Sequence, residues 1–382
     1  MYKPFPIIDI EGDATACGVQ YGEQAADRVA STVDFYLGAF GQQAKLTLAQ
    51  VRERARLFFA EIRALDPAIA SEIDGLAQGA RQRLDDIVAV NCRTELLFGS
   101  RGGDRPTTEC TTIVALPEAT RQKGVIVGKN WDWRSPAIDT VVILRVRQID
   151  KPALTLIVEA GMVGRDGFNE HGIAVCGNML TSGEDKGKVG VPIPILRRRI
   201  LNSRHFYEAI DTLTRSARGA SGNYLLAHAD GVAINFETTP DNVYPVYPKS
   251  GLLTHSNHFQ SLAAETNGVA KSYNGDSLYR DFRARQLLEP KIGDITIEDV
   301  KSVLRDKFGS PRAICRSPHD YPGQGSTMTI ASLVFDLANE VVHVAAGQPD
   351  RSEYESVGLP AHNAQPNHHP RIQSPRLSPK QS

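Results

Sequence analysis

Apolar residues recur at intervals of three or four positions over most of the stretch from 14 to 98. The clearest run begins behind Thr47-Leu48-Ala49-Gln50, where a hydroxyl and an amide three residues apart are typical of a helix N-terminus. After an interruption at Pro67, the same spacing continues through two further segments, 69–80 and 87–98. A repeat near 3.6 residues places apolar side chains on one face of a helix. The region 14–98 is therefore predicted to be helical, with these side chains in a core.

The pattern changes after residue 110, where short apolar runs alternate with turn residues, as expected for strands. Asp230-Gly231 and Ala338-Asn339 each join two such runs as a hairpin. Helical patterns return over 194–213, 275–288 and 296–307. Helices first, then many strands with helical insertions, indicate an α+β fold with stacked layers. The predicted strands are 111–116, 125–129, 140–146, 153–158, 173–176, 223–228, 232–236, 329–336 and 341–345.

Composition indicates an ordinary globular enzyme-sized chain. The 382 residues are 41% hydrophobic with a formal net charge of −1, a length that allows one large domain or two modest ones. The charge argues against nucleic acid or a membrane surface as a partner. The N-terminus lacks a signal-peptide pattern, and no apolar run approaches the ~20 residues that span a bilayer. Five scattered cysteines without a C-x-x-C pair argue against disulfides and zinc, so a cytoplasmic location is expected.

The segment 351–382 is expected to be a disordered tail. From Leu359 onward it is rich in Pro, His, Ser and Gln and has almost no large apolar residues. Such a segment cannot bury enough surface to offset the entropy lost on ordering.

Cys110 is the first candidate for chemistry, because it opens an apolar strand directly after the polar loop 99–109. Cleavage of the Glu109–Cys110 bond would turn Cys110 into an amino terminus. One residue would then carry a thiol nucleophile and an α-amine, whose reference pKa of about 7.7–8.0 suits a general base. The alternative is a buried, inert cysteine, which is the more common role of this residue type.

Asp132 and Asn257 are the next candidates. The strand after Cys110 returns as an antiparallel hairpin and ends in Asn130-Trp131-Asp132-Trp133, which brings Asp132 back near Cys110. Two tryptophans can exclude water there and strengthen electrostatic contacts. The alternative is that Asp132 only caps a turn at the end of the strand. In Thr254-His255-Ser256-Asn257-His258, the Asn257 amide could donate to an oxyanion. The His pair lacks the Glu or Cys that would complete a zinc set, so no metal is expected.

The glycine-rich stretch 161–172 is not a dinucleotide-binding fingerprint, because its glycines are spaced G-x-x-G-x-x-G. A tight turn that passes close to a ligand fits these glycines better. Among basic residues, Arg134, Arg165 and Arg312 are candidates to meet an anionic substrate, although surface solvation is the ordinary role of an arginine.

Taken in order, these motifs resemble the acyl-CoA:6-aminopenicillanic acid acyltransferase family of N-terminal nucleophile (Ntn) hydrolases. The resemblance rests on Cys-Thr-Thr, Asn-Trp-Asp, the glycine-rich stretch and His-x-Asn-His, with Gly18-x-x-Tyr21-Gly22 near the start. It implies a four-layer αββα sandwich and autocatalytic cleavage into an α chain (1–109), released by the cleavage, and a β chain with a catalytic core over 110–350.

The resemblance also implies roles for individual residues. Cys110 would be the nucleophile, Asp132 would assist processing and position the new terminus, and Asn257 would form the oxyanion hole. Thr112 would support the nucleophile. The chain departs from the penicillin enzyme at Glu109, where that enzyme has Gly, so Glu109 could assist or slow the acyl shift.

The main hypothesis is a self-processing cysteine amidohydrolase that cleaves the C–N bond of a small N-acyl compound, with no cofactor. One alternative is an acyltransferase that moves an acyl group from a thioester to an amine. Another is an unprocessed hydrolase with His255 as the base and Asn257 as its orienter. A non-catalytic binding protein is the last. The acyl group, the amine and the oligomeric state, a homo-oligomer included, are left open by the sequence.

Overall fold

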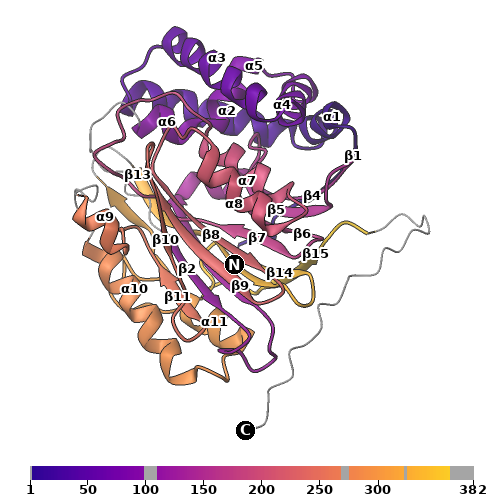
Figure 1. Ribbon diagram of the computed structural model, residues 1–382. Helices are drawn as coiled ribbons and strands as arrows, with labels where there is room; N and C mark the ends of the chain where they lie inside the picture. The colour runs from indigo at the N-terminus through magenta and orange to yellow at the C-terminus, as the bar shows by residue number, and fades with distance from the viewer. Residues whose placement is uncertain (1, 99–109, 268–274, 322–324, 362–382) are drawn as a thin grey trace.

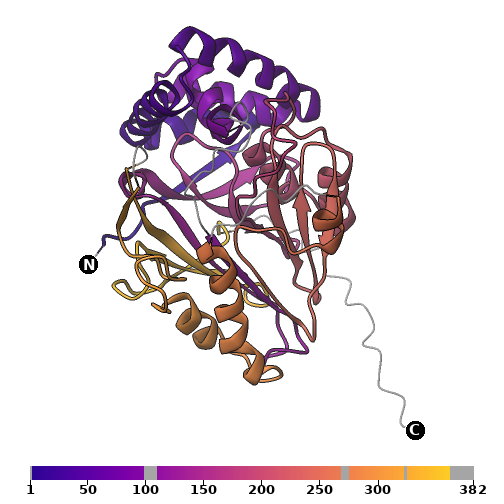
Figure 2. The same cartoon turned by 90° about the vertical axis from the view of Figure 1, so that its left-hand side faces the viewer.

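A computed structural model describes residues 2–98, 110–267, 275–321 and 325–361. Within these ranges two β-sheets lie face to face between two layers of helices (Figure 1; Figure 2). The fold is therefore α+β with four layers in the order αββα, as predicted. Glu109 and the rest of the loop 99–109 lie outside the described residues. No described helix is long and apolar enough to cross a membrane.

The first sheet has eight strands in the order β1-β4-β5-β6-β7-β8-β9-β10. Its neighbours pair antiparallel except β1 and β4, which run parallel. The Asp230-Gly231 hairpin is confirmed, since β8 and β9 pair across it. The bounds are β1 Ile7–Gly12, β4 Val141–Gln148, β5 Leu154–Glu159, β6 Asp166–Asn169, β7 Ile173–Cys176, β8 Gly222–His228, β9 Val232–Thr238 and β10 Val243–Val246.

The second sheet is antiparallel and has the order β11-β2-β3-β13-β14-β15, with β12 paired to β13. The predicted hairpin across Ala338-Asn339 is confirmed by the pairing of β13 and β14. The bounds are β2 Cys110–Ala115, β3 Ile126–Arg134, β11 Leu252–His255, β12 His319–Tyr321, β13 Gly325–Asp336, β14 Val341–Ala346 and β15 Glu355–Gly358.

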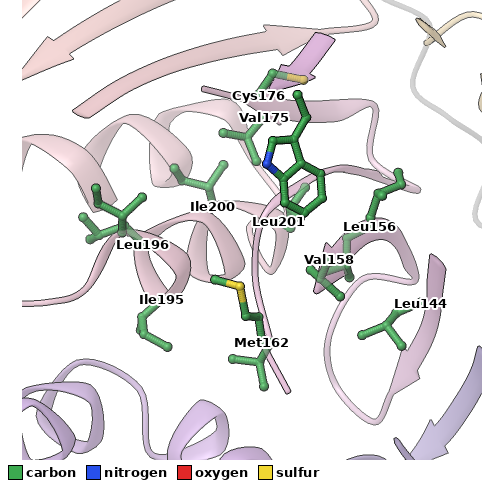
Figure 3. Close-up of a cluster of buried hydrophobic side chains, with 14 of the residues drawn as sticks. Leu144, Leu156, Val158, Met162, Val175, Cys176, Ile195, Leu196, Ile200 and Leu201 are labelled. Atoms are coloured by element: carbon green, nitrogen blue, oxygen red, sulfur yellow. The ribbon is translucent and has the colours of Figure 1, made fainter. Parts of the chain in front are cut away.

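One helical layer covers the first sheet. In Figure 1 the N-terminal helices lie at the top, with α7 and α8 between them and the sheet. Figure 3 shows Ile195, Leu196, Ile200 and Leu201 of α7 beside strand residues such as Leu156. The bounds are α1 Ala14–Gln24, α2 Ala26–Gln43, α3 Leu48–Leu65, α4 Pro67–Gly79, α5 Leu84–Asn91, α6 Arg93–Phe98, α7 Ile193–Leu201 and α8 Phe206–Arg215.

The two helices α1 and α4 cross closely because glycines face each other. A Cβ on Gly18 would lie 2.1 Å from the Glu72 carbonyl oxygen, and one on Gly75 would lie 2.3 Å from the Thr15 carbonyl oxygen. Distances this short are not tolerated, so only glycine fits at these positions. The Gly18-x-x-Tyr21-Gly22 pattern thus has a packing role.

The other helical layer covers the second sheet with α10 (Gly275–Leu288) and α11 (Ile297–Leu304), while α9 (Leu262–Thr266) follows β11. Because side chains alternate along a strand, Ile113 and Ala115 of β2 join the core beneath these helices. Cys110 and Val114 instead belong to the core between the sheets. In that core Phe168 of the first sheet meets Phe335 of the second, with ring centroids 5.9 Å apart.

Two sequence expectations need correction. The segment 351–382 is not disordered throughout, because β15 pairs antiparallel with β14 and Val357 is buried in the core. The prediction failed because it rested on the polar composition from Leu359 onward, whereas the apolar Val357 just before it packs into the core. Residues 362–382 lie outside the described part. The capping box at Thr47 is confirmed at the start of α3, but β1, which precedes the helices, was not predicted.

Candidate active site

A pocket lies where the two sheets and α6 and α7 meet, and Cys110 is in its wall. It holds about 520 Å³ of empty space, its open mouth included. The glycine-rich stretch supplies part of the wall, as expected for a turn near a ligand. The lining residues are Arg93, Thr94, Cys110, Asp132, Trp133, Met162, Gly164, Arg165, Gly177, Asn178, Met179, Ile193, Pro194 and Arg197.

Cys110 is the first residue of β2 and is held through both ends of its own backbone. Its N–H donates to Asn257 Oδ1 over 2.7 Å. Its carbonyl accepts from Arg280 Nη1 of α10 over 2.7 Å. The residue is only 5% exposed, yet it lines the pocket. The structure therefore fixes the position of the nitrogen that would become the amine and leaves the residue accessible to a ligand.

The Asn257 side chain has one orientation that satisfies its neighbours. Its Oδ1 accepts from Cys110 and from Arg280 Nη2, the latter over 3.1 Å, while Nδ2 donates to the Met179 carbonyl over 2.9 Å. Exchanging oxygen and nitrogen would place donors against donors. An amide nitrogen has two hydrogens, so one N–H remains for an oxyanion. The oxyanion role of Asn257 stays a prediction, and its hold on the Cys110 nitrogen is a contact the sequence did not suggest.

Asp132 lies where the hairpin places it. Cys110 pairs with Trp131 across β2 and β3, so Asp132 is the next residue along. Its Oδ1 accepts from Thr329 Oγ1 over 2.6 Å, and its Oδ2 is 3.8 Å from Arg316 Nε. Burial raises the pKa of this carboxyl to about 7, although Arg280 and the Thr329 hydrogen bond oppose the shift. A proton is thus exchangeable here near neutral pH.

His255 is engaged away from Cys110. Its Nε2 meets Glu237 Oε1 at 2.9 Å and its Nδ1 meets Asn178 Nδ2 at 3.1 Å, and all three side chains are buried. Asn178 also donates to Thr112 Oγ1 over 3.0 Å. This geometry disfavours the hypothesis in which His255 is the base, since both ring nitrogens have other partners. It places Thr112 of β2 in the same network, and the supporting role of Thr112 stays a prediction.

The second histidine of this segment, His258, does not share a helix with His255. His255 ends a strand rather than lying on a helix with His258. Burial, and then the charges of His255 and Arg280, lower the pKa of His258 to about 3. Among the described residues, no three His, Cys, Asp or Glu side chains are arranged to hold a metal ion.

Of the three arginines considered, the structure places Arg165 in the pocket. Arg134 donates to Gln43, and the Arg312 guanidinium lies 4.9 Å from the Tyr321 ring. The sequence did not single out Arg280 or Asn178. The run Arg197-Arg198-Arg199 predicted a solvated helix face, but Arg197 and Arg198 are buried. Arg280 lies 170 positions from Cys110 in the sequence. The helix that carries it has an ordinary amphipathic pattern, so no local motif identifies Arg280 as a site residue.

Comparison with known proteins agrees with this geometry. Residues 119–351 match the family described as "Acyl-coenzyme A:6-aminopenicillanic acid acyl-transferase". The chain belongs to this family. The "Acyl-coenzyme A:6-aminopenicillanic-acid-acyltransferase 40 kDa form" of Emericella nidulans is 26% identical over 354 residues, which are 91% of this chain and 94% of the relative.

Two solved structures give weaker likenesses. A Caenorhabditis elegans N-acylethanolamine-hydrolyzing acid amidase ortholog is 16% identical with a TM-score of 0.44, over 66% of this chain and 100% of its own. Penicillin V acylase from Agrobacterium tumefaciens is 17% identical with a TM-score of 0.43, over 62% and 83%. The activities of these two proteins do not transfer to this chain at such scores.

Proposed function

We propose that this protein is a self-processing cysteine amidohydrolase that cleaves the C–N bond of a small N-acyl compound. The observation that carries the proposal is the contact between the Cys110 nitrogen and Asn257 Oδ1, in a residue that also lines the pocket. A hydrogen-bond acceptor at that nitrogen is what a catalytic α-amine requires, because it orients the amine lone pair.

Processing begins with attack of the Cys110 thiol sulfur on the carbonyl carbon of Glu109. The C–N bond between the two residues breaks, the Glu109 acyl group moves to sulfur, and the nitrogen takes the thiol proton to become a free amine. Water then hydrolyses the thioester, which releases the Glu109 carboxyl and restores the thiol. Asn257 Oδ1 and the Arg280 contact hold the nitrogen and carbonyl of Cys110 during these steps.

Turnover uses the same atoms. The amine takes the thiol proton, the sulfur attacks the substrate carbonyl, and the second N–H of Asn257 donates to the oxyanion. The protonated amine gives its proton to the leaving nitrogen as the C–N bond breaks. Water attacks the resulting thioester, and the acid leaves. Asp132 and Thr112 are positioning residues in this scheme, since their contacts go to Thr329, Arg316 and Asn178.

The resemblance implies that the cleavage releases the chain 1–109 from the peptide bond; we further propose that this chain nevertheless stays bound afterwards, while 110–350 forms the catalytic core. Parallel pairing of β1 with β4 and the buried ion pair between Glu72 of α4 and Arg198 of α7, at 2.7 Å, support this. Arg93 and Thr94 of α6 also line the pocket. Loss of the N-terminal chain would therefore remove part of the binding site. A reducing, cytoplasmic location suits the five free cysteines.

Acyl transfer is the second candidate, and the family description and the relative in Emericella nidulans favour it. The chemistry is the same as far as the acyl-enzyme, and an amine then replaces water. Incubation with an acyl thioester in the presence and absence of an amine separates the two functions. Faster loss of thioester with formation of a new amide identifies transfer, and formation of free acid alone identifies hydrolysis.

The experiment that tests the proposed function is trapping of the acyl-enzyme. Purified protein is mixed with an activated N-acyl substrate and quenched in acid, and the peptide that begins with Cys110 is examined by mass spectrometry. The proposal expects an adduct on this peptide that is absent from a Cys110→Ala variant. Turnover without any adduct or dependence on Cys110 would contradict it.

A further inference from the structure

A buried cluster of charged side chains beside the pocket carries more positive than negative charge, and two of its members, Arg165 and Arg197, line the pocket. Asp166 is the single carboxylate of a buried cluster in which Lys129 Nζ lies 3.0 Å from it, Arg197 Nη1 3.2 Å and Arg165 Nε 3.5 Å. Each of these side chains is at least nine-tenths buried. Three cations therefore share one anion, which leaves an excess of two positive charges.

Neighbouring acidic groups do not remove this excess. Glu159 is paired with Arg93 at 2.9 Å, and Asp132 has Arg316 beside it. Glu95 accepts from the Ile193 N–H, and burial raises its pKa to about 7. Uncompensated buried charge costs several kcal/mol per ion. Burial, with repulsion from Arg93 and Arg197, lowers the pKa of Arg165 to about 10 even though Asp166 opposes the shift. An anion bound in the pocket would offset this excess of positive charge.

The two arginines of this cluster, Arg165 and Arg197, both line the pocket and are oriented by aromatic rings. The Arg165 guanidinium stacks 3.5 Å from the centroid of Trp131, the residue paired with Cys110, and Arg197 lies 5.7 Å from the Tyr224 ring. Stacking occupies the face of a guanidinium and leaves its edge donors for a planar anion. In the described part of the chain, Nε of Arg165 and Nε of Arg197 are buried without a hydrogen-bond acceptor.

We propose that Arg165 and Arg197 form a carboxylate-binding subsite, so that the substrate is an N-acyl amino acid or a similar anion with its carboxylate close to the scissile amide. This inference rests on the proposed function. The guanidinium fork matches a carboxylate in two parallel hydrogen bonds. The phosphates of an acyl-CoA lie a whole pantetheine arm from the thioester, so they do not reach cations that line the same pocket as the nucleophile.

The test compares a set of straight-chain N-acylglycines with the corresponding N-acylglycinamides, which differ only in charge. We expect the wild type to favour the acid by about 10–100-fold in kcat/KM, the range for charge-assisted hydrogen bonds. The Arg165→Gln variant should lose most of that preference through a raised KM for the acids. It should still fold, because Lys129 and Arg197 still neutralise Asp166. Arg165→Lys should keep part of it. Arg215→Gln, whose side chain is 78% exposed on α8, is the matched control and should match wild type.

Equal or better cleavage of the glycinamides by wild type would overturn the inference and leave the amidohydrolase function standing. If neither series is cleaved, thermal unfolding of Cys110→Ala with each compound decides. A rise in Tm with the acids alone supports the subsite, and no rise or an equal rise overturns it. Failure of the proposed function is seen separately, as the absence of an acyl adduct on Cys110.

Discussion

The two sides of the pocket are both buried and polar, but they are built differently. On the Cys110 side, Asn257 Oδ1 accepts from the Cys110 N–H and Arg280 donates to the Cys110 carbonyl, so each directed hydrogen bond engages one specific backbone atom. On the Asp166 side, three cations surround one carboxylate at 3.0 to 3.5 Å. Directed bonds fix the position of a reacting group, whereas excess charge attracts a ligand. We therefore propose that one side carries out the chemistry and the other recognises the substrate.

Removal of the nucleophile should have the largest effect. Cys110→Ala is expected to lose at least about 10³-fold in kcat, the scale of losses seen when a nucleophile is deleted, and to stay as one uncleaved chain. Turnover assays and a denaturing gel measure the two outcomes. Cys17→Ala, a buried cysteine on α1 whose thiol donates to the Gly12 carbonyl, is the matched control. Equal activity in both variants would remove Cys110 from the mechanism.

The raised pKa of Asp132 predicts a pH dependence of stability. In the unfolded chain the pKa of the carboxyl is near its ordinary value of 3.8, and in the folded protein burial raises this pKa to about 7. The folded state therefore binds more protons between these values, so stability should fall as pH rises from 4 to 7, by up to about 4 kcal/mol.

Urea unfolding of the wild type and of Asp132→Asn at several pH values checks this dependence. The variant should show a flatter profile, with the slope that Glu95 contributes still present. Asp320→Asn, which alters an exposed carboxyl on β12, should keep the wild-type profile. An identical slope in wild type and Asp132→Asn would contradict the assignment.

Asn257 should affect rate rather than binding. Asn257→Ala is expected to lower kcat by about 10²–10³-fold with KM nearly unchanged, since an oxyanion donor and the acceptor of the amine are both lost. Steady-state kinetics measure the split. Asn339→Ala, on the hairpin turn after β13, serves as the control. A change confined to KM would mean that Asn257 acts in substrate recognition and not in the chemical step.

Arg280 and Arg165 test the comparison most sharply, because the same substitution is made on each side. Arg280→Gln loses a donor to the Cys110 carbonyl, so we expect kcat to fall by about 10–100-fold through misplacement of the nucleophile. Arg280→Lys should recover part of the rate. Arg165→Gln should instead act through KM on anionic substrates. Identical kinetic defects in the two Gln variants would contradict the distinction between a catalytic side and a recognition side of the pocket.

His255 should have the smallest effect of these side chains. Its nitrogens meet Glu237 and Asn178, so His255→Gln is expected to reduce kcat by less than about tenfold, as for a positioning residue outside proton transfer. The pH–rate profile should keep its shape. A loss of 10³-fold, with disappearance of the limb near the pKa of a histidine, would restore the Cys–His hypothesis.

Sequence patterns predicted the fold where periodicity is local. The helix over 275–288 and the hairpins that place Asp132 and β9 follow from side-chain alternation and turn residues. Strands β10 and β15 pair with β9 and β14, their neighbours in the chain, and were missed because each has only four residues and contains a Pro or a Gly. Strand β1 was missed because its partner lies far along the chain: it pairs with β4 more than 130 residues later. Pairing of this kind has no local signature.

For the candidate site as well, residues in local motifs could be predicted from the sequence, whereas residues that depend on long-range contacts could not. Cys110, Asp132 and Asn257 were predicted as site residues because each belongs to a short motif in family order, and the structure brings Cys110 into contact with Asn257. Arg280, Arg197 and Asn178 come from elements whose sequences show only amphipathic or glycine-rich character. Their roles depend on distances across the two sheets, which the sequence alone does not contain.

Intact-mass analysis of the purified protein tests the central claim most directly, because the claim requires an amine on Cys110. Self-processing predicts two chains that co-purify under native conditions, 1–109 and 110–382, with Cys110 at the start of the second. It also predicts that Cys110→Ala remains a single chain. An active wild-type protein with an unbroken bond between Glu109 and Cys110 would contradict it.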